Sequence, residues 1–147
     1  MLKYKLLHGP ITEILAGAGH HAKVLIADGN YPSSTARGAD AEVISLALSP
    51  GLVNCTQVLE ALVSAVPIEA ANTMAYETTG PYALQVDPPV WAEYRRVLAE
   101  AKLNLKLDPI EKWAFYEAVR SVDHVLTIQT ADEQRFANLL LTIGVRM

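Results

Sequence analysis

The sequence predicts an α/β fold in which a central sheet is flanked by helices. Short apolar runs rich in β-branched residues, each bounded by turn residues, are typical of buried strands. These runs alternate with segments whose apolar residues recur at helical spacing. The 147 residues contain no internal repeat, low-complexity tract or linker, so we expect one layered domain over residues 1–147.

The first half of the chain contains two expected helices and three expected strands. Thr12 is a candidate helix cap, and Gly17 is typical of the residue at which a helix ends. Ser49-Pro50-Gly51 marks a turn after the second apolar run, and Pro67 stops the second helical pattern. The expected elements are a helix over 12–17, strands over 23–28 and 42–48, a helix over 56–66 and a strand over 67–75.

The second half begins with a helix opened by Pro88 and Pro89. A further helix start follows, because Asp108 is a good cap, Pro109 suits a first turn and Glu111 stands three residues after the cap. The expected elements are a helix over 88–98, a strand over 104–107, a helix over 108–119 and closing strands over 125–130 and 138–145.

Composition and charge exclude several classes of protein. A net charge of −4 and an isoelectric point near 5.5 argue against nucleic acid binding, which needs a clustered basic face. With 51% apolar and 19% charged residues, we expect a core-rich globular protein with buried subunit interfaces. No segment reaches the ~18 to 20 apolar residues of a membrane span, and the N-terminus breaks too early for a signal peptide. Cys55 is the lone cysteine, so we expect a cytoplasmic protein.

The sequence contains no recognisable cofactor or metal motif. Gly17-Ala18-Gly19 follows a helix and precedes a strand, which is the wrong order for a phosphate-binding loop. In an extended segment His20 and His21 should point to opposite faces, which makes a poor metal pair. His8 and His124 have no partner at metal-ligand spacing either. We therefore expect neither a metal nor a cofactor.

His20 and Asp28 flank the first predicted strand and are the leading candidates for chemistry. A histidine near the surface can act as a general acid and base at neutral pH. A straight strand of about seven steps at ~3.3 Å would hold the two backbones about 23 Å apart. The two residues can therefore share one small ligand within a chain only if the strand bends or starts late. Otherwise another subunit completes the site.

Each candidate residue also has a simpler structural interpretation. His20 could cap the preceding helix, and Asp28 could merely form a turn. Lys112 could be a solvated charge, and Asn138 a turn amide. The aromatic residues over 113–116 could pack in the core or could stack on sugar rings. From the residues alone, the inference ends at an α/β domain with one candidate acid–base histidine.

Five short motifs, in one order over nearly the whole chain, add to this interpretation. They are Gly19-His20, the apolar strand ending in Asp28, Asn30-Tyr31-Pro32, the stretch over 110–117 and the C-terminal run over 136–145. Together they resemble the D-ribose pyranase / L-fucose mutarotase family. The run over 44–51 is more similar to the pyranase branch, and the aromatic helix over 113–117 is more similar to the fucose branch.

The resemblance implies an isomerase that interconverts anomers or ring forms of L-fucose, D-ribose or a related monosaccharide, without metal or cofactor. It also implies ring-shaped homo-oligomers, here a decamer of two pentameric rings, with sugar sites at contacts between adjacent subunits. Carried over by position, His20 is the proton donor and Asp28 binds sugar hydroxyls. Lys112 and the triplet Phe136, Ala137 and Asn138 are the further substrate-binding residues.

Three positions depart from the family pattern. Ala22 stands where a carboxylate is common two residues after the histidine. Lys112 stands where the fucose branch has an arginine, and lysine lacks the planar two-point contact. Phe136 replaces a tyrosine, so Tyr31 or Tyr116 would have to supply the missing hydroxyl. The alternative function is therefore a non-catalytic monosaccharide-binding protein for sensing or uptake on the same scaffold.

Overall fold

A computed structural model describes residues 2–147. The strands in this part of the chain are β1 (Lys23–Ala27), β2 (Glu42–Ser45), β3 (Ile68–Met74), β4 (Leu107–Ile110), β5 (His124–Gln129) and β6 (Leu139–Ile143). The helices are α1 (Gly9–Gly17), α2 (Cys55–Leu62), α3 (Pro89–Glu100) and α4 (Lys112–Val119). Within residues 2–147 no helix is both long enough and apolar enough to cross a bilayer.

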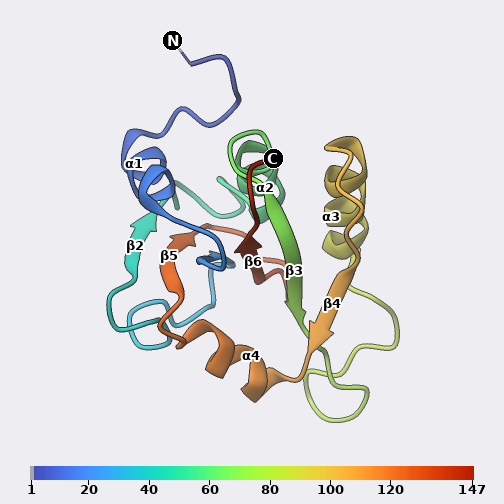
Figure 1. The fold of residues 1–147 in the computed structure, drawn as a ribbon. Helices are drawn as coiled ribbons and strands as arrows, with labels where there is room; N and C mark the ends of the chain where they lie inside the picture. The colour runs from blue at the N-terminus through green and yellow to red at the C-terminus, as the bar shows by residue number, and fades with distance from the viewer. Residues whose placement is uncertain (1) are drawn as a thin grey trace.

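The strands form one mixed sheet in the order β2-β5-β1-β6-β3-β4 (Figure 1). Strand β5 pairs in parallel with β1 and β2, and β3 pairs in parallel with β4. Strand β6 lies between these two groups and runs antiparallel to both of its neighbours, β1 and β3. The predicted α/β fold with a central sheet and flanking helices is confirmed.

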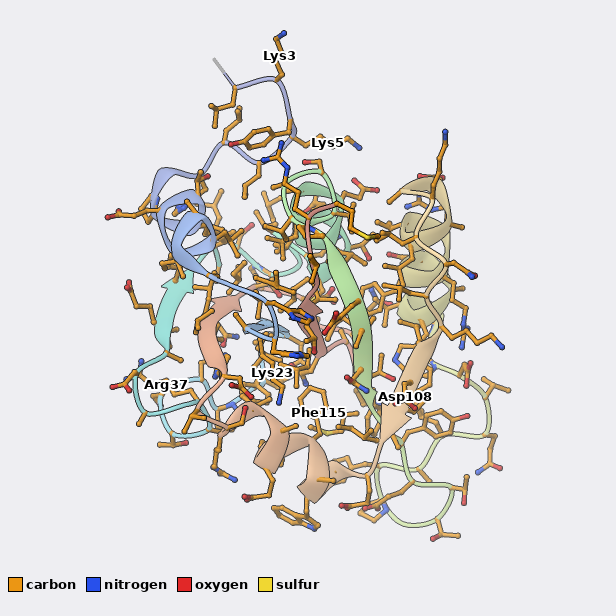
Figure 2. The ribbon with its side chains drawn as sticks, in the orientation of Figure 1. Lys3, Lys5, Lys23, Arg37, Asp108 and Phe115 are labelled. Carbon is orange, nitrogen blue, oxygen red and sulfur yellow. The ribbon has the colours of Figure 1, made fainter. Side chains whose placement is uncertain are left out.

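Alternate residues of β1 feed two separate cores on the two faces of the sheet. Val24 and Ile26 pack in a large core with buried residues of α1, α2 and α3. Leu25 and Ala27 pack in a smaller core with Phe115 of α4. In Figure 1, α4 lies apart from the other three helices, and in Figure 2 Phe115 is drawn between α4 and the sheet. The two cores arise because successive side chains of this apolar strand point to opposite faces of the sheet.

Two helices begin earlier than the sequence predicted. Helix α1 starts at Gly9 because the His8 ring accepts a hydrogen bond from the Ile11 N–H at 3.3 Å. Thr12, the expected cap, lies inside the helix, and its hydroxyl donates to the His8 carbonyl. Helix α2 starts at Cys55, one residue early, because Asn54 and Gln57 form a reciprocal capping box.

The prediction that a helix begins at Asp108 is wrong. Residues Leu107–Ile110, including Asp108 and Pro109, form the edge strand β4 on β3. The helix begins at Lys112, and the Glu111 carboxylate caps it by accepting the N–H groups of Trp113 and Ala114. Proline is tolerated on an edge strand because one side of that strand has no ladder partner. The expected strand over 104–107 is thus displaced toward the C-terminus.

Further boundaries differ from the predictions, and among the helices α2 ends at Leu62 rather than at residue 66. Strand β2 ends at Ser45 rather than at residue 48, and β6 covers Leu139–Ile143 rather than 138–145. Leu46 still donates to the Gln129 carbonyl, so pairing with β5 stops just after Ser45. At these ends of β2 and β6 the chain leaves the sheet and enters a loop.

Candidate functional site

A cavity of about 430 Å³ opens beside the carboxyl end of β1. This volume falls within the range of pockets that hold small organic ligands. Its walls include Asp28, Lys112, Phe136 and Asn138, four of the residues expected to contact substrate. Both tyrosines considered as hydroxyl sources, Tyr31 and Tyr116, also line it. The fold therefore assembles in one place residues that lie up to 110 positions apart in the sequence.

Asp28 and Asn138 form a reciprocal pair in the wall of this cavity. The Asn138 amide donates to the Asp28 carboxylate at 2.9 Å, and its Oδ1 accepts the Asp28 N–H at 2.9 Å. The other Asp28 oxygen accepts the N–H of Asn30 at 3.0 Å. Asp28 thus forms the turn that the simpler interpretation required and also presents a carboxylate to the cavity. Both side chains are buried and held rigidly where β1 ends and β6 begins.

Burial changes the acid–base behaviour of Asp28. Desolvation raises the pKa of this carboxyl to about 6, and the buried carboxylate of Asp132 acts in the same direction. The hydrogen bond from Asn30 opposes the rise without cancelling it. At neutral pH Asp28 is therefore mostly ionised, and near pH 6 it exchanges a proton readily.

The two candidate tyrosines differ in whether their hydroxyl groups are available. The Tyr31 hydroxyl is buried and donates to the Ala36 carbonyl at 3.0 Å, and burial raises its pKa. The Tyr116 ring stacks against Tyr31 with 5.6 Å between centroids. Among residues 2–147, no protein atom is hydrogen-bonded to the Tyr116 hydroxyl. Tyr116 therefore offers a free hydroxyl to the cavity, whereas Tyr31 offers mainly its ring.

Two side chains of α3 hold the backbone around Phe136 by hydrogen bonds. The Trp91 indole donates to the Phe136 carbonyl at 3.0 Å, and the Tyr94 hydroxyl donates to the Ala137 carbonyl. Phe136 has a φ of 59°, a left-handed backbone that a bulky residue seldom adopts. Ala137 is fully buried and does not line the cavity. This strained backbone aims the Phe136 ring at the cavity while Ala137 packs in the core.

Of the first residues of α4, one packs in the core and others lie at the surface or line the cavity. Phe115 is fully buried in the smaller core, as the packing interpretation required. Trp113 is 66% exposed, and the Lys112 ammonium lies 5.2 Å from its ring centroid. Lys112 itself lines the cavity from this helix. One helix thus contributes a core anchor and a charged, aromatic rim.

His20 lies away from this cavity, at the opposite end of β1. Its Nε2 contacts the Glu69 carboxylate on β3 at 2.9 Å, and α1 is closed by the backbone of Ala18, so His20 is not its cap. The expectation that His20 and His21 point apart is wrong, because their rings stack with 3.7 Å between centroids. A φ of 71° at His21 turns the chain and places both rings on the same side.

Glu69 contacts both histidines, with its second oxygen 3.2 Å from His21 Nδ1. Within residues 2–147 these three exposed side chains form the one group of histidine, cysteine and acidic residues close enough to share a metal ion. Sequence reasoning missed this group because Glu69 lies 49 residues from His20.

Three further cavity residues with charged or aromatic side chains were also missed. Glu77 and Tyr82 come from the loop after β3, and Arg135 comes from the segment before β6. The Arg135 guanidinium donates to the Tyr82 carbonyl at 3.4 Å, which links the two segments. Their sequence context carried no signal, because each lies in a segment without helical or strand periodicity.

The fold and the cavity define an α/β protein that offers a small polar ligand a buried carboxylate, an amide, a free hydroxyl and aromatic faces. The chain belongs to the RbsD / FucU transport protein family, whose model matches residues 1–146.

Three similar proteins illustrate the range of this family. The fucose mutarotase of Bos taurus is 27% identical, over 95% of this chain and 90% of its own length. The D-ribose pyranase of Pseudomonas putida (strain GB-1) is 29% identical, over 99% of this chain and 98% of its own length. The crystal structure of the fucose mutarotase of Streptococcus pneumoniae in complex with L-fucose has a TM-score of 0.79. It is 21% identical and covers 99% of this chain and 100% of that one. This structural likeness establishes the shared fold.

Proposed function

We propose that this protein is a cytoplasmic monosaccharide mutarotase or pyranase. It interconverts the anomers or ring forms of L-fucose, D-ribose or a related monosaccharide. The proposal rests on the cavity that Asp28, Asn138 and Tyr116 line together, with Asn138 hydrogen-bonded to Asp28. The names of the relatives support the same activity, since they include both fucose mutarotases and D-ribose pyranases.

The reaction needs only positioned proton transfers. A sugar hemiacetal opens when an acid protonates the ring oxygen while a base removes the proton of the anomeric hydroxyl. Rotation about one bond and reclosure on the other face complete the exchange. Such transfers contribute about 10²- to 10⁴-fold, so the mechanism needs no metal or cofactor. Asp28 and Asn138 hold the sugar hydroxyls, Lys112 and Phe136 form the rim, and His20 gives and takes the proton.

His20 reaches the sugar from a neighbouring subunit. Within one chain β1 separates His20 from Asp28, so a second copy must bring its own histidine to the cavity. Exposed apolar side chains lie around β2 and the loop after it, where Val43 is 37%, Leu48 79% and Leu52 42% exposed. Leu48 lines a second hollow that shares Asn30 and Tyr31 with the cavity. This surface suits a subunit contact beside the site.

The proposed assembly is a ring-shaped homo-oligomer, with a decamer of two pentameric rings as the specific form. Ten chains of 16.0 kDa give a particle of about 160 kDa. Sedimentation velocity at micromolar protein should therefore show one species near this mass. A monomer at that concentration would contradict both the ring and the shared site.

Saturation-transfer proton NMR on the anomeric signals tests the activity directly. We expect protein-dependent transfer between the anomers or ring forms of L-fucose, D-ribose or a close analogue. Running several monosaccharides in parallel identifies the sugar. Line broadening without transfer for every sugar would instead support a sugar receptor, the alternative that the loss of the tyrosine at Phe136 raises.

Tyr116 should supply the hydroxyl that Phe136 lacks. The Tyr116→Phe variant should slow exchange roughly tenfold, because one hydrogen bond to a sugar oxygen is lost. Adding Phe136→Tyr to this variant should restore part of the rate. The matched control is Tyr4→Phe, on the exposed N-terminal segment. If Phe136→Tyr alone creates exchange where the natural protein has none, the natural protein is a receptor.

A further inference from the structure

We propose that Glu69 is the positioning residue of His20 and that it determines which ring nitrogen exchanges the proton with the sugar. In this arrangement Glu69 holds the Nε2–H of His20, and Nδ1 is the working nitrogen. The proposal rests on the role given to His20 in the proposed function.

The contacts assign the hydrogen-bond roles. Glu69 Oε2 lies 2.9 Å from His20 Nε2, and Glu69 Oε1 lies 3.2 Å from His21 Nδ1. An ionised carboxylate can only accept hydrogen bonds, so the proton between Glu69 and His20 lies on Nε2. A neutral imidazole carries one N–H, so its Nδ1 then has the free lone pair. The half-exposed ring, with 42% of its side chain accessible, can present Nδ1 to a ligand or to another chain.

The contact between Glu69 and the two histidines lies beside the end of β6. His21 donates its N–H to the Ile143 carbonyl at 3.0 Å, which ties the histidine turn to that strand. Gly144 follows, and a Cβ at this position would come within 3.2 Å of the Glu69 Cβ and 3.6 Å of its Oε2. The absence of a side chain at Gly144 therefore leaves space for Glu69 to lie against the histidines.

Glu69 supplies the carboxylate that Ala22 cannot provide. Ala22 follows His20 by two residues and has no side-chain acceptor, so it cannot orient the imidazole. The carboxylate comes instead from β3, 49 residues further along the chain. A base oriented by a carboxylate partner is the usual arrangement for a histidine that must hold one tautomer during catalysis.

The first test reads the tautomer of His20 without any sugar. Long-range ¹H–¹⁵N correlation spectra of the whole protein, at a pH where His20 is neutral, should show His20 protonated on Nε2. In Glu69→Gln the amide can accept or donate, so we expect a mixture of both tautomers. Glu13→Gln is the matched control, because Glu13 is an exposed carboxylate on α1, and it should leave the His20 signals unchanged. A His20 protonated on Nδ1 in the natural protein would overturn the proposal.

The second test reads catalysis. Glu69→Gln should lower kcat for anomer exchange roughly 10- to 100-fold while KM changes little, because the ring is misplaced rather than removed. Gly144→Ala keeps the charge but crowds Glu69, and it should lower kcat in the same direction. Glu13→Gln should keep the natural rate. A natural kcat in Glu69→Gln, with exchange lost in His20→Ala, would overturn the proposal alone. Full exchange in His20→Ala would overturn the proposed function itself.

Discussion

The His20→Ala variant is expected to lose sugar exchange by roughly 10²- to 10⁴-fold, the range that one positioned acid–base group contributes. Sugar binding should weaken far less, because the hydroxyl-binding groups Asp28 and Asn138 stay in place. Saturation-transfer NMR gives the exchange rate, and isothermal titration gives the affinity. The matched control is His8→Asn, because asparagine preserves the cap of α1. Full exchange in His20→Ala would remove His20 from the mechanism.

A mixing experiment then asks whether His20 and Asp28 serve the cavity from different chains. His20→Ala and Asp28→Asn proteins are dissociated, mixed in equal amounts and reassembled. If each site takes its histidine from one subunit and its aspartate from the next, random assembly should restore about a quarter of the natural activity. If both residues act within one chain, no intact site can form, and the mixture should be no more active than the mean of the two variants measured separately. Recovery of activity thus requires a site shared between subunits.

Asp28→Asn is expected to weaken sugar binding roughly 10- to 100-fold, because hydrogen bonds to an ionised acceptor are worth about 1.5–3 kcal/mol. Binding by the natural protein should also weaken as the pH falls through about 6, where the Asp28 carboxyl takes up a proton. Titrations between pH 5 and 8 should show this dependence, and Asp28→Asn should lack it. The control Asp40→Asn, on an exposed turn, should retain it. Equal affinity at pH 5 and 8 in the natural protein would contradict the role of Asp28.

The Asp28 carboxyl should also make the free energy of unfolding depend on pH, in the opposite direction to sugar binding. Burial raises its pKa from 3.8 to about 6, so between these values the folded protein holds a proton that the unfolded chain has released. Its contribution to the free energy of unfolding therefore falls as the pH rises from 4 to 6 and stays low above 6. The change amounts to roughly 3 kcal/mol. Denaturant unfolding of natural and Asp28→Asn proteins at both ends of this range isolates it. Burying this carboxylate for binding therefore lowers the stability of the folded protein at neutral pH.

Local patterns predicted the elements well where one face of a segment is plainly apolar. Strand β1 and helix α3 lie within two residues of their expected bounds, because burial of Val24, Ile26 and Trp91 follows from the spacing of apolar residues. The prediction at Asp108 failed because a cap, a proline and an acid also start a helix in isolation. The open edge of β3 offers backbone partners to Leu107–Ile110, and this long-range pairing outweighs the local preference.

By itself, the sequence determined the α/β class, the buried strand β1 and the place of Asp28 at its end, because all three depend on the period of neighbouring residues. It also carried the motifs that indicate the family. Only the tertiary structure decided which groups meet. The sheet order brings Asn138 to Asp28 and α4 brings Tyr116 to the same cavity, while β3 brings Glu69 to His20 at the other end. These contacts join residues 49 to 110 positions apart, and strand pairing rather than sequence spacing determines which of them become neighbours.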